Sequence, residues 1–220
     1  MKAEPGEFLS LLTDEEVAAL RAAGRLRRWD RGTTVITEGD TSDWVLVLLE
    51  GRVKVSSHTS SGNEVVLAVR GPGGLIGEQS AIDGSPRSAT VTTLEPVTGV
   101  VVRDFVSFLE SHGRVAVLLM KLVSERLRDS DRKRIEYGAF DTTGRVATRL
   151  LELADRYGEQ TAGGLRVALP LSQDELAGWT GSSREAVSKA LRTLRDRGLI
   201  ETGRRRVTIH DVEGLRQRAR

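Results

Sequence analysis

The chain has 220 residues, of which 39% are hydrophobic, and its formal net charge at pH 7 is +2. This length and apolar fraction suffice for two small cores, so we expect two domains. The absence of cysteine excludes disulfides and cysteine-ligated zinc or iron–sulfur sites, while the lack of a long apolar run and of a secretory signal predicts a cytoplasmic protein without a membrane partner.

The first predicted element is a helix over residues 7–24. Thr13 and Glu16 have the spacing of a capping box, in which each side chain bonds to the backbone N–H of the other residue. Val17 and Leu20 follow where the apolar face of this helix would lie.

A β-rich stretch comes next. Its predicted strands are short and rich in β-branched residues, and they cover Thr33–Thr37, Trp44–Ser56, Glu64–Val69, Ala89–Thr93 and Val97–Val102. Glycine-containing turns separate most of them. This spacing predicts a compact all-β barrel or jelly roll, which could enclose a ligand.

A polar cassette, Gly77–Ala89, interrupts the β-rich stretch. Its first glycine lets the backbone approach a ligand, the Glu78 carboxylate suits a ribose hydroxyl, and the Arg87 guanidinium matches phosphate oxygens. Ser88 adds a hydroxyl, and Gln79–Pro86 is predicted as a loop whose N–H groups could face an anion. The alternative is a surface loop with an ion pair between Arg87 and Glu78.

Residues 104 to about 137 return to a helical period. Positions spaced by alternating steps of four and three form a predicted coiled-coil seam, namely Ala116, Met120, Val123, Leu127, Ser130, Arg134 and Tyr137. The first four are apolar and the next two are polar. This seam predicts that the helix pairs with a second helix and that its polar positions, Ser130 and Arg134, meet polar partners there. The alternative is a seam that frays as it leaves the core.

Two helix starts fall ten residues apart in the last third of the chain. Ser172 with Glu175, and Ser182 with Glu185, match the S-x-x-E capping box, and Gly181 lies between them. This arrangement predicts a helix-turn-helix.

The second of these helices would bury an apolar face and expose Arg184, Glu185, Ser188, Lys189 and Arg192. Arginine and lysine suit the acceptors of guanine, and glutamate suits the amino group of cytosine. The alternative for this charged face is an ordinary solvated helix surface.

Two short strands around a turn are predicted over Leu199–Ile209, with three consecutive arginines, Arg204, Arg205 and Arg206, which would meet backbone phosphates. From Asp141 onward there are 15 Arg and Lys against 11 Asp and Glu, whereas the preceding residues have 18 against 20. The basic excess therefore lies in the carboxy-terminal third, which weakly favours a nucleic-acid partner.

In this order, the motifs resemble those of the Crp/Fnr family of transcription regulators. The resemblance is carried by the phosphate-binding cassette, by a strand-turn-strand segment, by the hinge and by the recognition helix, which are Gly77-Glu78 with Arg87-Ser88-Ala89, Trp44–Val55, Asp141–Ala147 and Ser183–Lys189. It extends over nearly the whole chain.

The resemblance implies an α+β fold. The expected parts are a cyclic-nucleotide-binding β-roll, or jelly roll, over residues 1–112, a long dimerisation helix over 113–138 and a winged helix-turn-helix DNA-binding domain over 139–220. It also implies a homodimer that responds to a cyclic nucleotide and binds palindromic DNA sites related to TGTGA, with RNA polymerase as a further partner. The alternative is a family member that binds DNA without a ligand or with another effector.

Site residues follow from the same resemblance. Those expected to bind the cyclic nucleotide are Gly77, Glu78, Gln79, Ser80, Arg87, Ser88, Ala89, Ser130 and Asp131. Those expected to bind DNA are Ser172, Gln173, Ser183, Arg184, Glu185, Ser188, Lys189, Arg204 and Arg205. The expected dimer interface contains Ala116, Met120, Val123 and Leu127.

Asp131 departs from the family pattern. Ser130 falls on the family's base-contacting threonine, and Asp131 falls on its base-contacting serine, where an anion can only accept hydrogen bonds. A carboxylate could accept from the amino group of adenine or from two N–H groups of guanine, so cAMP is the expected ligand and cGMP stays open. Arg132, Lys133 or Arg134 could instead occupy Asp131 in an ion pair.

The sequence does not predict an enzyme. His58, His112 and His210 are scattered, and Glu78 has no neighbour placed as an acid or a base. We expect no bound metal, and haem ligation by His58 is disfavoured because that residue lies in a polar turn.

Overall fold

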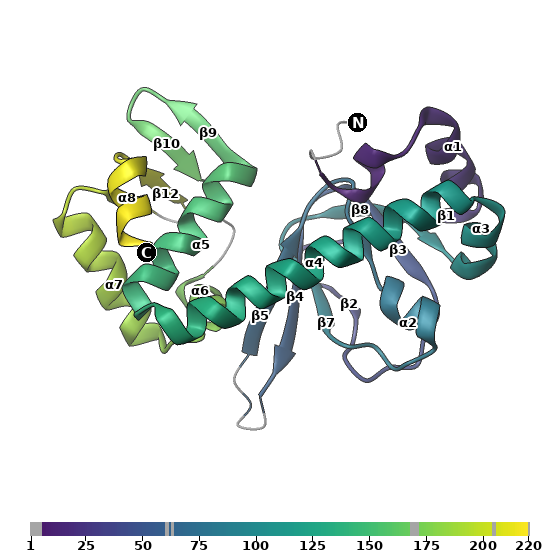
Figure 1. Ribbon diagram of the computed structural model, residues 1–220, viewed down its shortest axis with the longest axis horizontal. Coiled ribbons are helices and arrows are strands. Elements are labelled where there is room, and N and C mark those ends of the chain that lie inside the picture. Colours follow the sequence, from purple (N-terminus) through teal and green to yellow (C-terminus); the bar gives the residue numbers. More distant parts are fainter. Residues whose placement is uncertain (1–5, 60–61, 63, 168–171, 204–205, 220) are drawn as a thin grey trace. The chain divides into compact units, whose positions relative to one another are not determined.

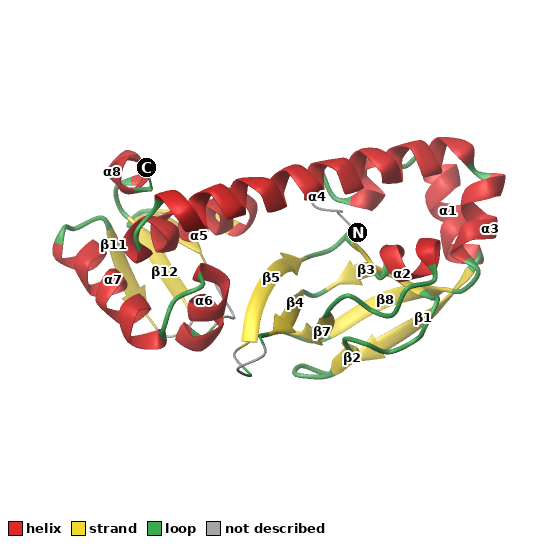
Figure 2. Cartoon of the chain, turned by 60° about the horizontal axis from the view of Figure 1, so that its bottom comes forward, coloured by secondary structure: helices red, strands yellow, loops and turns green. Residues whose placement is uncertain are grey.

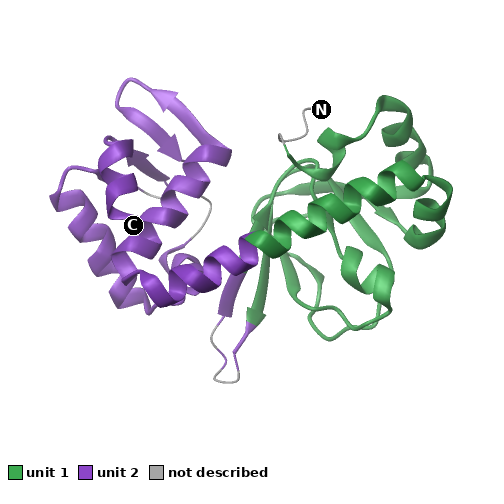
Figure 3. Ribbon diagram, in the orientation of Figure 1, with its two compact units in different colours: residues 1–57, 67–128 green, residues 58–66, 129–220 purple. Residues whose placement is uncertain are grey.

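The computed structural model describes the whole chain except residues 1–5, 60, 61, 63, 168–171, 204, 205 and 220. The chain divides into two compact units, shown in different colours in Figure 3. The first unit comprises residues 1–57 and 67–128, and the second comprises residues 58–66 and 129–220. The α+β class predicted from the sequence is confirmed, whereas the predicted domain boundaries stay predictions.

Two four-stranded antiparallel sheets form the β-roll, with strand orders β1-β8-β3-β6 and β2-β7-β4-β5. The strands are β1 (Gly24–Trp29), β2 (Thr34–Ile36), β3 (Val45–Glu50), β4 (Val53–His58), β5 (Glu64–Arg70), β6 (Leu75–Ile76), β7 (Thr90–Thr93) and β8 (Val97–Val102).

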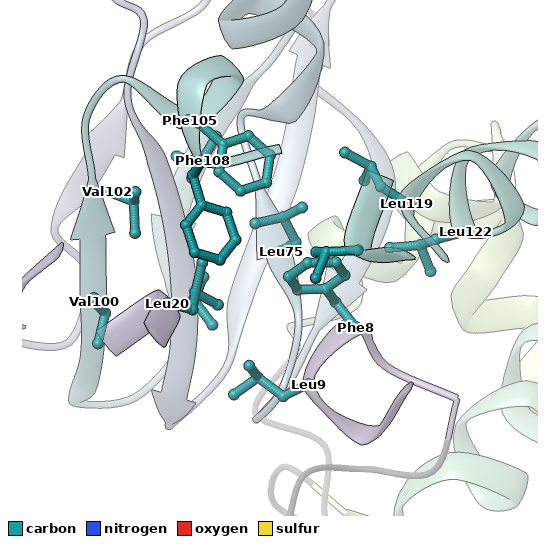
Figure 4. Packing of buried hydrophobic residues seen from close by; sticks show 13 residues of the cluster. Phe8, Leu9, Leu20, Leu75, Val100, Val102, Phe105, Phe108, Leu119 and Leu122 are labelled. Carbon is teal, nitrogen blue, oxygen red and sulfur yellow. The ribbon is translucent and has the colours of Figure 1, made fainter. Parts of the chain in front are cut away.

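Strand β3 separates two hydrophobic clusters. Because side chains alternate along a strand, Val45 and Val47 enter one cluster while Leu46 and Leu48 enter the other. The first cluster also receives residues from helices, including Phe8, Leu20, Phe105, Leu119 and Leu122, several of which Figure 4 shows around Leu75. The uninterrupted apolar run of β3 therefore reflects burial on both faces.

The helical elements before the second unit are the 3-10 helix η1 (Phe8–Leu11), α1 (Asp14–Ala22), α2 (Glu78–Asp83), α3 (Phe105–Ser111) and α4 (Gly113–Ala139). Figure 2 shows α4 as one continuous helix. Val115, Leu119 and Leu122 pack its inner face into the first hydrophobic cluster. The seam residues Met120, Val123 and Leu127 are 61%, 36% and 62% exposed in the single chain.

Two local predictions for the first unit need correction, and one strand was not predicted. The expected helix over residues 7–24 is shorter, although the capping box of Thr13 and Glu16 at the start of α1 is confirmed. The strand that was not predicted is β1, an edge strand whose middle four side chains are exposed, so it lacks the alternation by which strands are predicted. Much of the loop expected after Gly77 is the short helix α2.

The second unit contains the helix-turn-helix (Figure 1). Its elements are α5 (Thr142–Tyr157), β9 (Gly158–Thr161), β10 (Gly164–Val167), α6 (Gln173–Thr180), α7 (Arg184–Asp196), β11 (Ile200–Gly203), β12 (Arg206–Ile209) and α8 (Val212–Arg218). The strands form one sheet in the order β11-β12-β10-β9. The hairpin β11-β12 is the predicted wing, and its sheet also takes in β9 and β10, which the sequence analysis did not predict.

The two predicted capping boxes of the helix-turn-helix have different outcomes. At α6 the box is present, because Ser172 accepts from Glu175 N and the Glu175 side chain accepts from Ser172 N. At α7 the residue predicted to cap the helix, Ser182, was wrong. Ser183, not Ser182, accepts from Ala186 N at 3.2 Å, because Ser182 is used by Arg145 instead.

Across the described residues, no helix combines the length and the hydropathy that crossing a bilayer would need.

Candidate ligand-binding and DNA-binding sites

Gly77 starts the cassette in a conformation that favours glycine. It is the N-cap of α2 with φ of +83°, and a Cβ at this position would lie 2.4 Å from Nη1 of Arg87. A larger residue would therefore be strained and would also displace the guanidinium. The backbone of Gly77 is thus fitted to the side chain of Arg87.

Arg87 is held in place by three hydrogen bonds and is only 3% exposed. It donates from Nη1 to the Gly77 carbonyl at 2.8 Å, from Nη2 to the Trp44 carbonyl at 2.6 Å and from Nε to Ser42 Oγ at 2.7 Å. A guanidinium has five N–H protons, so one proton on each terminal nitrogen lacks a hydrogen-bond acceptor among the described residues. These two protons suit two oxygens of one phosphate.

The surroundings of Arg87 make it a buried cation that lacks a directly bonded anion. Burial lowers the pKa of Arg87, while the nearby carboxylates of Asp43, Glu78 and Asp40 act in the opposite direction. All three bonded acceptors are neutral oxygens. A small anion at this position would pair with a partly desolvated charge, where charge-assisted bonds are strong.

Glu78 is the first residue of α2 and is also buried, at 5% exposure. Its Oε1 accepts from Nη1 of Arg126, on α4, at 2.6 Å, and Nη2 of Arg126 donates to the Leu75 carbonyl at 2.9 Å. The alternative of an ion pair between Arg87 and Glu78 is therefore wrong, because the partner of the carboxylate is Arg126. The cassette is tied to the long helix through this pair.

The other predicted ligand residues have varied positions. Ser88 donates to Gln79 Oε1 at 2.9 Å, and this bond between two exposed side chains links the end of the cassette to its beginning. Ser80 and Ala89 are buried.

Ser130 and Asp131 lie exposed on the part of α4 that belongs to the second unit. Asp131 faces Arg134 at 3.8 Å, which is one of the alternatives that the sequence left open. Both side chains are more than half exposed, so this ion pair contributes little and leaves the carboxylate accessible. A role in base recognition stays a prediction for these two residues.

Sequence reasoning missed three residues that hold the cassette, namely Ser42, Trp44 and Arg126. Only Arg126 carried a usable signal. It precedes Ser130 by four residues on the predicted long helix, and residues four apart lie on one face of a helix. Trp44 acts through its carbonyl and its ring, which no motif specifies.

The candidate DNA-binding surface is the exposed face of α7. An open depression there is lined by Gln173, Arg184, Glu185, Ser188, Lys189, Arg192 and Thr193. On the opposite face Val187, Ala190, Leu191 and Leu194 are buried. The predicted division of α7 into an apolar and a charged face is therefore present.

The amino-terminal end of α7 presents both signs of charge. Arg184 lies 3.6 Å from Asp174 of α6, in an exposed pair that contributes little stability and leaves the arginine accessible. Glu185 accepts hydrogen bonds from its own backbone N–H and from the Ser183 side chain. These bonds lower the pKa of the Glu185 carboxyl, which keeps the carboxylate a hydrogen-bond acceptor. Ser172 and Gln173 start α6 and are exposed.

The predicted wing contacts fall partly outside the described residues. Arg204 and Arg205 are among the residues that the structure does not describe, whereas Arg206 is exposed at the start of β12.

Within the second unit, Arg145 joins the end of α4 to the turn between α6 and α7. It donates from Nη1 to the Phe140 carbonyl and from Nε to the Thr180 carbonyl, both at 2.7 Å, and from Nη2 to Ser182 Oγ at 3.0 Å. Tyr137 donates to the Trp179 carbonyl at 3.2 Å. The helix-turn-helix is therefore anchored to the last turn of the long helix.

Comparisons with known proteins agree with this geometry. A model of the cyclic nucleotide-binding domain matches residues 26–112, and a model of the Crp-like helix-turn-helix domain matches residues 144–218. The first matched domain contains the buried arginine and the second contains the charged recognition helix. Together they define a class of protein, the DNA-binding regulator with a cyclic-nucleotide-binding domain.

The particular family follows from individual relatives. The chain is 36% identical over 206 residues to a CRP-like cAMP-activated global transcriptional regulator of Mycobacterium tuberculosis, covering 93% of this chain and 92% of that protein. It is 28% identical to the cyclic AMP receptor protein of Thermus thermophilus, covering 94% and 93%. The chain belongs to the CRP/FNR family, whose members are transcription regulators and not enzymes.

A solved structure supports the fold over most of the chain. A CRP-family transcriptional regulator from Thermus thermophilus superposes with a TM-score of 0.75 at 27% identity, covering 88% of this chain and 96% of that one.

Proposed function

We propose that this protein is a homodimeric transcription regulator of the cytoplasm that binds cAMP and, in response, binds palindromic DNA sites related to TGTGA. The observation that carries the proposal is Arg87, a buried cation with two N–H protons left for an anion, in a chain that also carries a recognition helix. RNA polymerase is the partner through which bound protein would alter transcription.

The choice of cAMP rests on the names of two relatives, one described as cAMP-activated and the other as a cyclic AMP receptor. In the cassette, Arg87 would hold the cyclic phosphate, and Glu78 would accept from the ribose hydroxyl while remaining paired with Arg126. Asp131 keeps cGMP open as a ligand, because its carboxylate could accept from two N–H groups of guanine.

The proposal of a dimer is supported by the outer face of α4. Met120, Val123 and Leu127 follow the steps of a coiled-coil seam and are exposed in the single chain. Exposed apolar residues at this spacing bury their surface when the same helix of a second copy packs against them.

The proposed DNA contacts divide by chemistry. Arg184, Glu185 and Lys189 would read base edges from the exposed end of α7, whereas Ser172, Gln173 and Ser183 would bind phosphates. Arg204 and Arg205 of the wing would add phosphate contacts without sequence preference. In a dimer, two recognition helices would need a spacing of about 34 Å, one turn of DNA.

Ligand and DNA would be coupled through the long helix. The helix carries Arg126 in the ligand site, and its last turn is bonded to the turn of the helix-turn-helix through Arg145. A coupling free energy of about 1 to 3 kcal/mol would change DNA affinity about 5- to 150-fold, and DNA would raise cAMP affinity by the same factor. This requires that cAMP binds one conformation more tightly than the other.

Calorimetric titration with cAMP and with cGMP tests the ligand. Wild-type protein should bind cAMP, and Arg87→Ala should lose at least about a hundredfold in affinity, because it removes charge-assisted bonds to the phosphate. Ser85→Ala, an exposed residue of the same cassette, is the control and should bind as wild type. Equal heats for wild type and Arg87→Ala with both nucleotides would contradict the proposal.

The DNA arm uses a palindromic TGTGA duplex and a scrambled duplex of equal length, each with and without cAMP. Affinity for the palindrome alone should rise with cAMP, and Glu185→Ala should remove the preference for the palindrome. A family member that acts without a ligand would bind the palindrome equally in both conditions.

A further inference from the structure

A loop that precedes the cassette by more than thirty residues lies against Arg87. Between β2 and β3 the chain passes Gly39 and Asp40, which are hydrogen-bonded to the backbone of Arg87. Gly39 N donates to the Arg87 carbonyl, and Arg87 N donates to the Asp40 carbonyl, both at 2.9 Å. These two bonds fix where the Arg87 side chain begins.

The same loop then fixes where the side chain ends. Ser42 Oγ accepts from Nε at 2.7 Å, and the Trp44 carbonyl accepts from Nη2 at 2.6 Å. Within the described part of the chain, Ser42 is the only side chain that accepts a hydrogen bond from Arg87. Both Ser42 and Trp44 are themselves half-buried.

The indole of Trp44 restricts the guanidinium from a third direction. Cζ of Arg87 lies 5.0 Å from the centre of the ring, which is within the range of a cation–π contact. Hydrogen bonds in the plane of the guanidinium and a ring over its face together remove most of the freedom of a side chain that otherwise has many rotamers.

We propose that Ser42 and Trp44 are positioning residues of the phosphate site, which hold Arg87 with its two remaining N–H protons directed to the ligand. The proposal rests on the proposed function, because it names residues that serve the same anion. Since a ligand that meets an ordered arginine does not have to immobilise it, this arrangement raises the affinity for the phosphate. Trp44 also becomes an optical reporter, because an anion on Arg87 changes the field at the indole.

Affinity for cAMP is the first measurement. Ser42→Ala leaves the buried Nε proton without an acceptor and should weaken cAMP binding about tenfold, whereas Ser42→Thr retains the hydroxyl and should restore it. Trp44→Leu should weaken binding about threefold to tenfold, and Trp44→Phe, which keeps an aromatic ring, should lose less. The control is Thr41→Ala, an exposed neighbour in the same loop that should bind as wild type.

Tryptophan fluorescence is the second measurement, because the emission of Trp44 should change when an anion binds beside its indole. If Trp44 only supported the fold, cAMP would not change its emission. Addition of cAMP should change the emission of wild-type protein, and the change should disappear in Trp44→Phe. It should persist in Trp29→Phe, which removes another of the three tryptophans. Thermal unfolding of each variant identifies any that has lost its fold, and the conservative variants Ser42→Thr and Trp44→Phe keep the test valid in that case.

The outcomes separate this inference from the proposed function. If Arg87→Ala loses cAMP while Ser42→Ala and Trp44→Leu bind it as wild type does, the positioning role is wrong and the proposed function stands. If wild-type protein binds neither cAMP nor cGMP, the proposed function fails, and the positioning role fails with it.

Discussion

At the scale of single residues, Gly77 is the position where backbone and ligand site constrain each other most directly. Gly77→Ala would add a methyl group 2.4 Å from Nη1 of Arg87, at a φ of +83°. We expect cAMP affinity to fall at least about tenfold, and the free energy of unfolding to fall by about 1 kcal/mol because of the backbone strain. Calorimetry and urea unfolding measure the two effects.

Gly84 provides the matched control for this substitution. It ends the same short helix with φ of +70°, but a Cβ there would meet no atom within 4 Å. Gly84→Ala should therefore show the strain without the loss of cAMP binding. Equal losses of affinity in the two variants would mean that displacement of Arg87 is not the cause.

Individual residues of the candidate site could be selected from the sequence where one residue type has one distinctive chemistry. The pair of Glu78 and Arg87 could be selected because a carboxylate and a guanidinium so close to a glycine suit a phosphorylated sugar. Their partners were harder to select. Arg126 shares a helix face with Ser130, which is its one signal, but it is one of many cations on that helix, and Trp44 contributes a carbonyl that every residue type possesses. Such contacts depend on tertiary packing, which a local sequence pattern does not predict.

At the scale of elements, the start of α5 combines a cap with an ion pair. Asp141 accepts from Gly144 N at 2.8 Å and also from Arg218 of α8. The bond from Gly144, followed by the contact with Arg218, lowers the pKa of Asp141. A carboxyl whose pKa is lower in the folded state stabilises the fold above its unfolded pKa of about 3.9, and this contribution is lost as the pH falls through the folded pKa.

Asp141→Asn tests this pH dependence, since asparagine keeps the capping oxygen and removes the charge. Above about pH 5 the variant should be less stable than wild type by under about 1 kcal/mol, a small value because the Asp141 side chain is 60% exposed to solvent. Toward pH 3 the difference should shrink. Urea unfolding across this range measures it, and a difference that grows in acid would contradict the assignment.

Two companion variants separate the cap from the ion pair. Asp141→Ala also removes the capping oxygen and should cost about 1 kcal/mol more than Asp141→Asn at neutral pH. Arg218→Ala leaves the cap in place and should reduce only part of the pH dependence, because the bond from Gly144 has the larger effect on the pKa.

Elements with a regular pattern were predictable, and those that lacked one were not. The strands β4, β7 and β8 carry β-branched residues beside turn signals, and α7 has a clean apolar face. The strand β1 exposes its middle four residues as an edge strand, so no apolar alternation marks it. The start of α7 was displaced by one residue because Ser182 and Ser183 offer equivalent hydroxyls, and only the neighbouring Arg145 decides between them.

At the scale of the whole molecule, the order of elements is more informative than any one of them. A glycine-punctuated β region, a long helix and a helix-turn-helix occur in one chain, and that order made the family recognisable from moderately specific motifs. The long helix in this order exposes apolar seam residues in the single chain, so a substitution in the seam tests the proposed association of two copies directly.

Leu127→Asp tests the proposed dimer at a seam position that is 62% exposed. If α4 pairs with α4 of a second copy, each buried leucine stabilises the dimer by about 2 kcal/mol, so the loss from two copies should weaken dimerisation by roughly a thousandfold. Sedimentation at micromolar concentration should show monomers. Binding to the palindrome should weaken, while the much weaker binding to a single half-site should be unchanged.

Ile135→Asp is the control for an apolar side chain that does not belong to the seam. It lies on the same helix and is 68% exposed, but one position beyond the seam residue Arg134, which turns it by about 100° around the helix. This variant should remain a dimer and keep its preference for the palindrome. Monomers from both variants would mean that any charge on α4 disrupts association, and dimers from both would place the interface elsewhere. Monomers from Leu127→Asp alone would assign the dimer contact to the exposed seam residues of α4. The same contact would then determine the spacing of the two recognition helices.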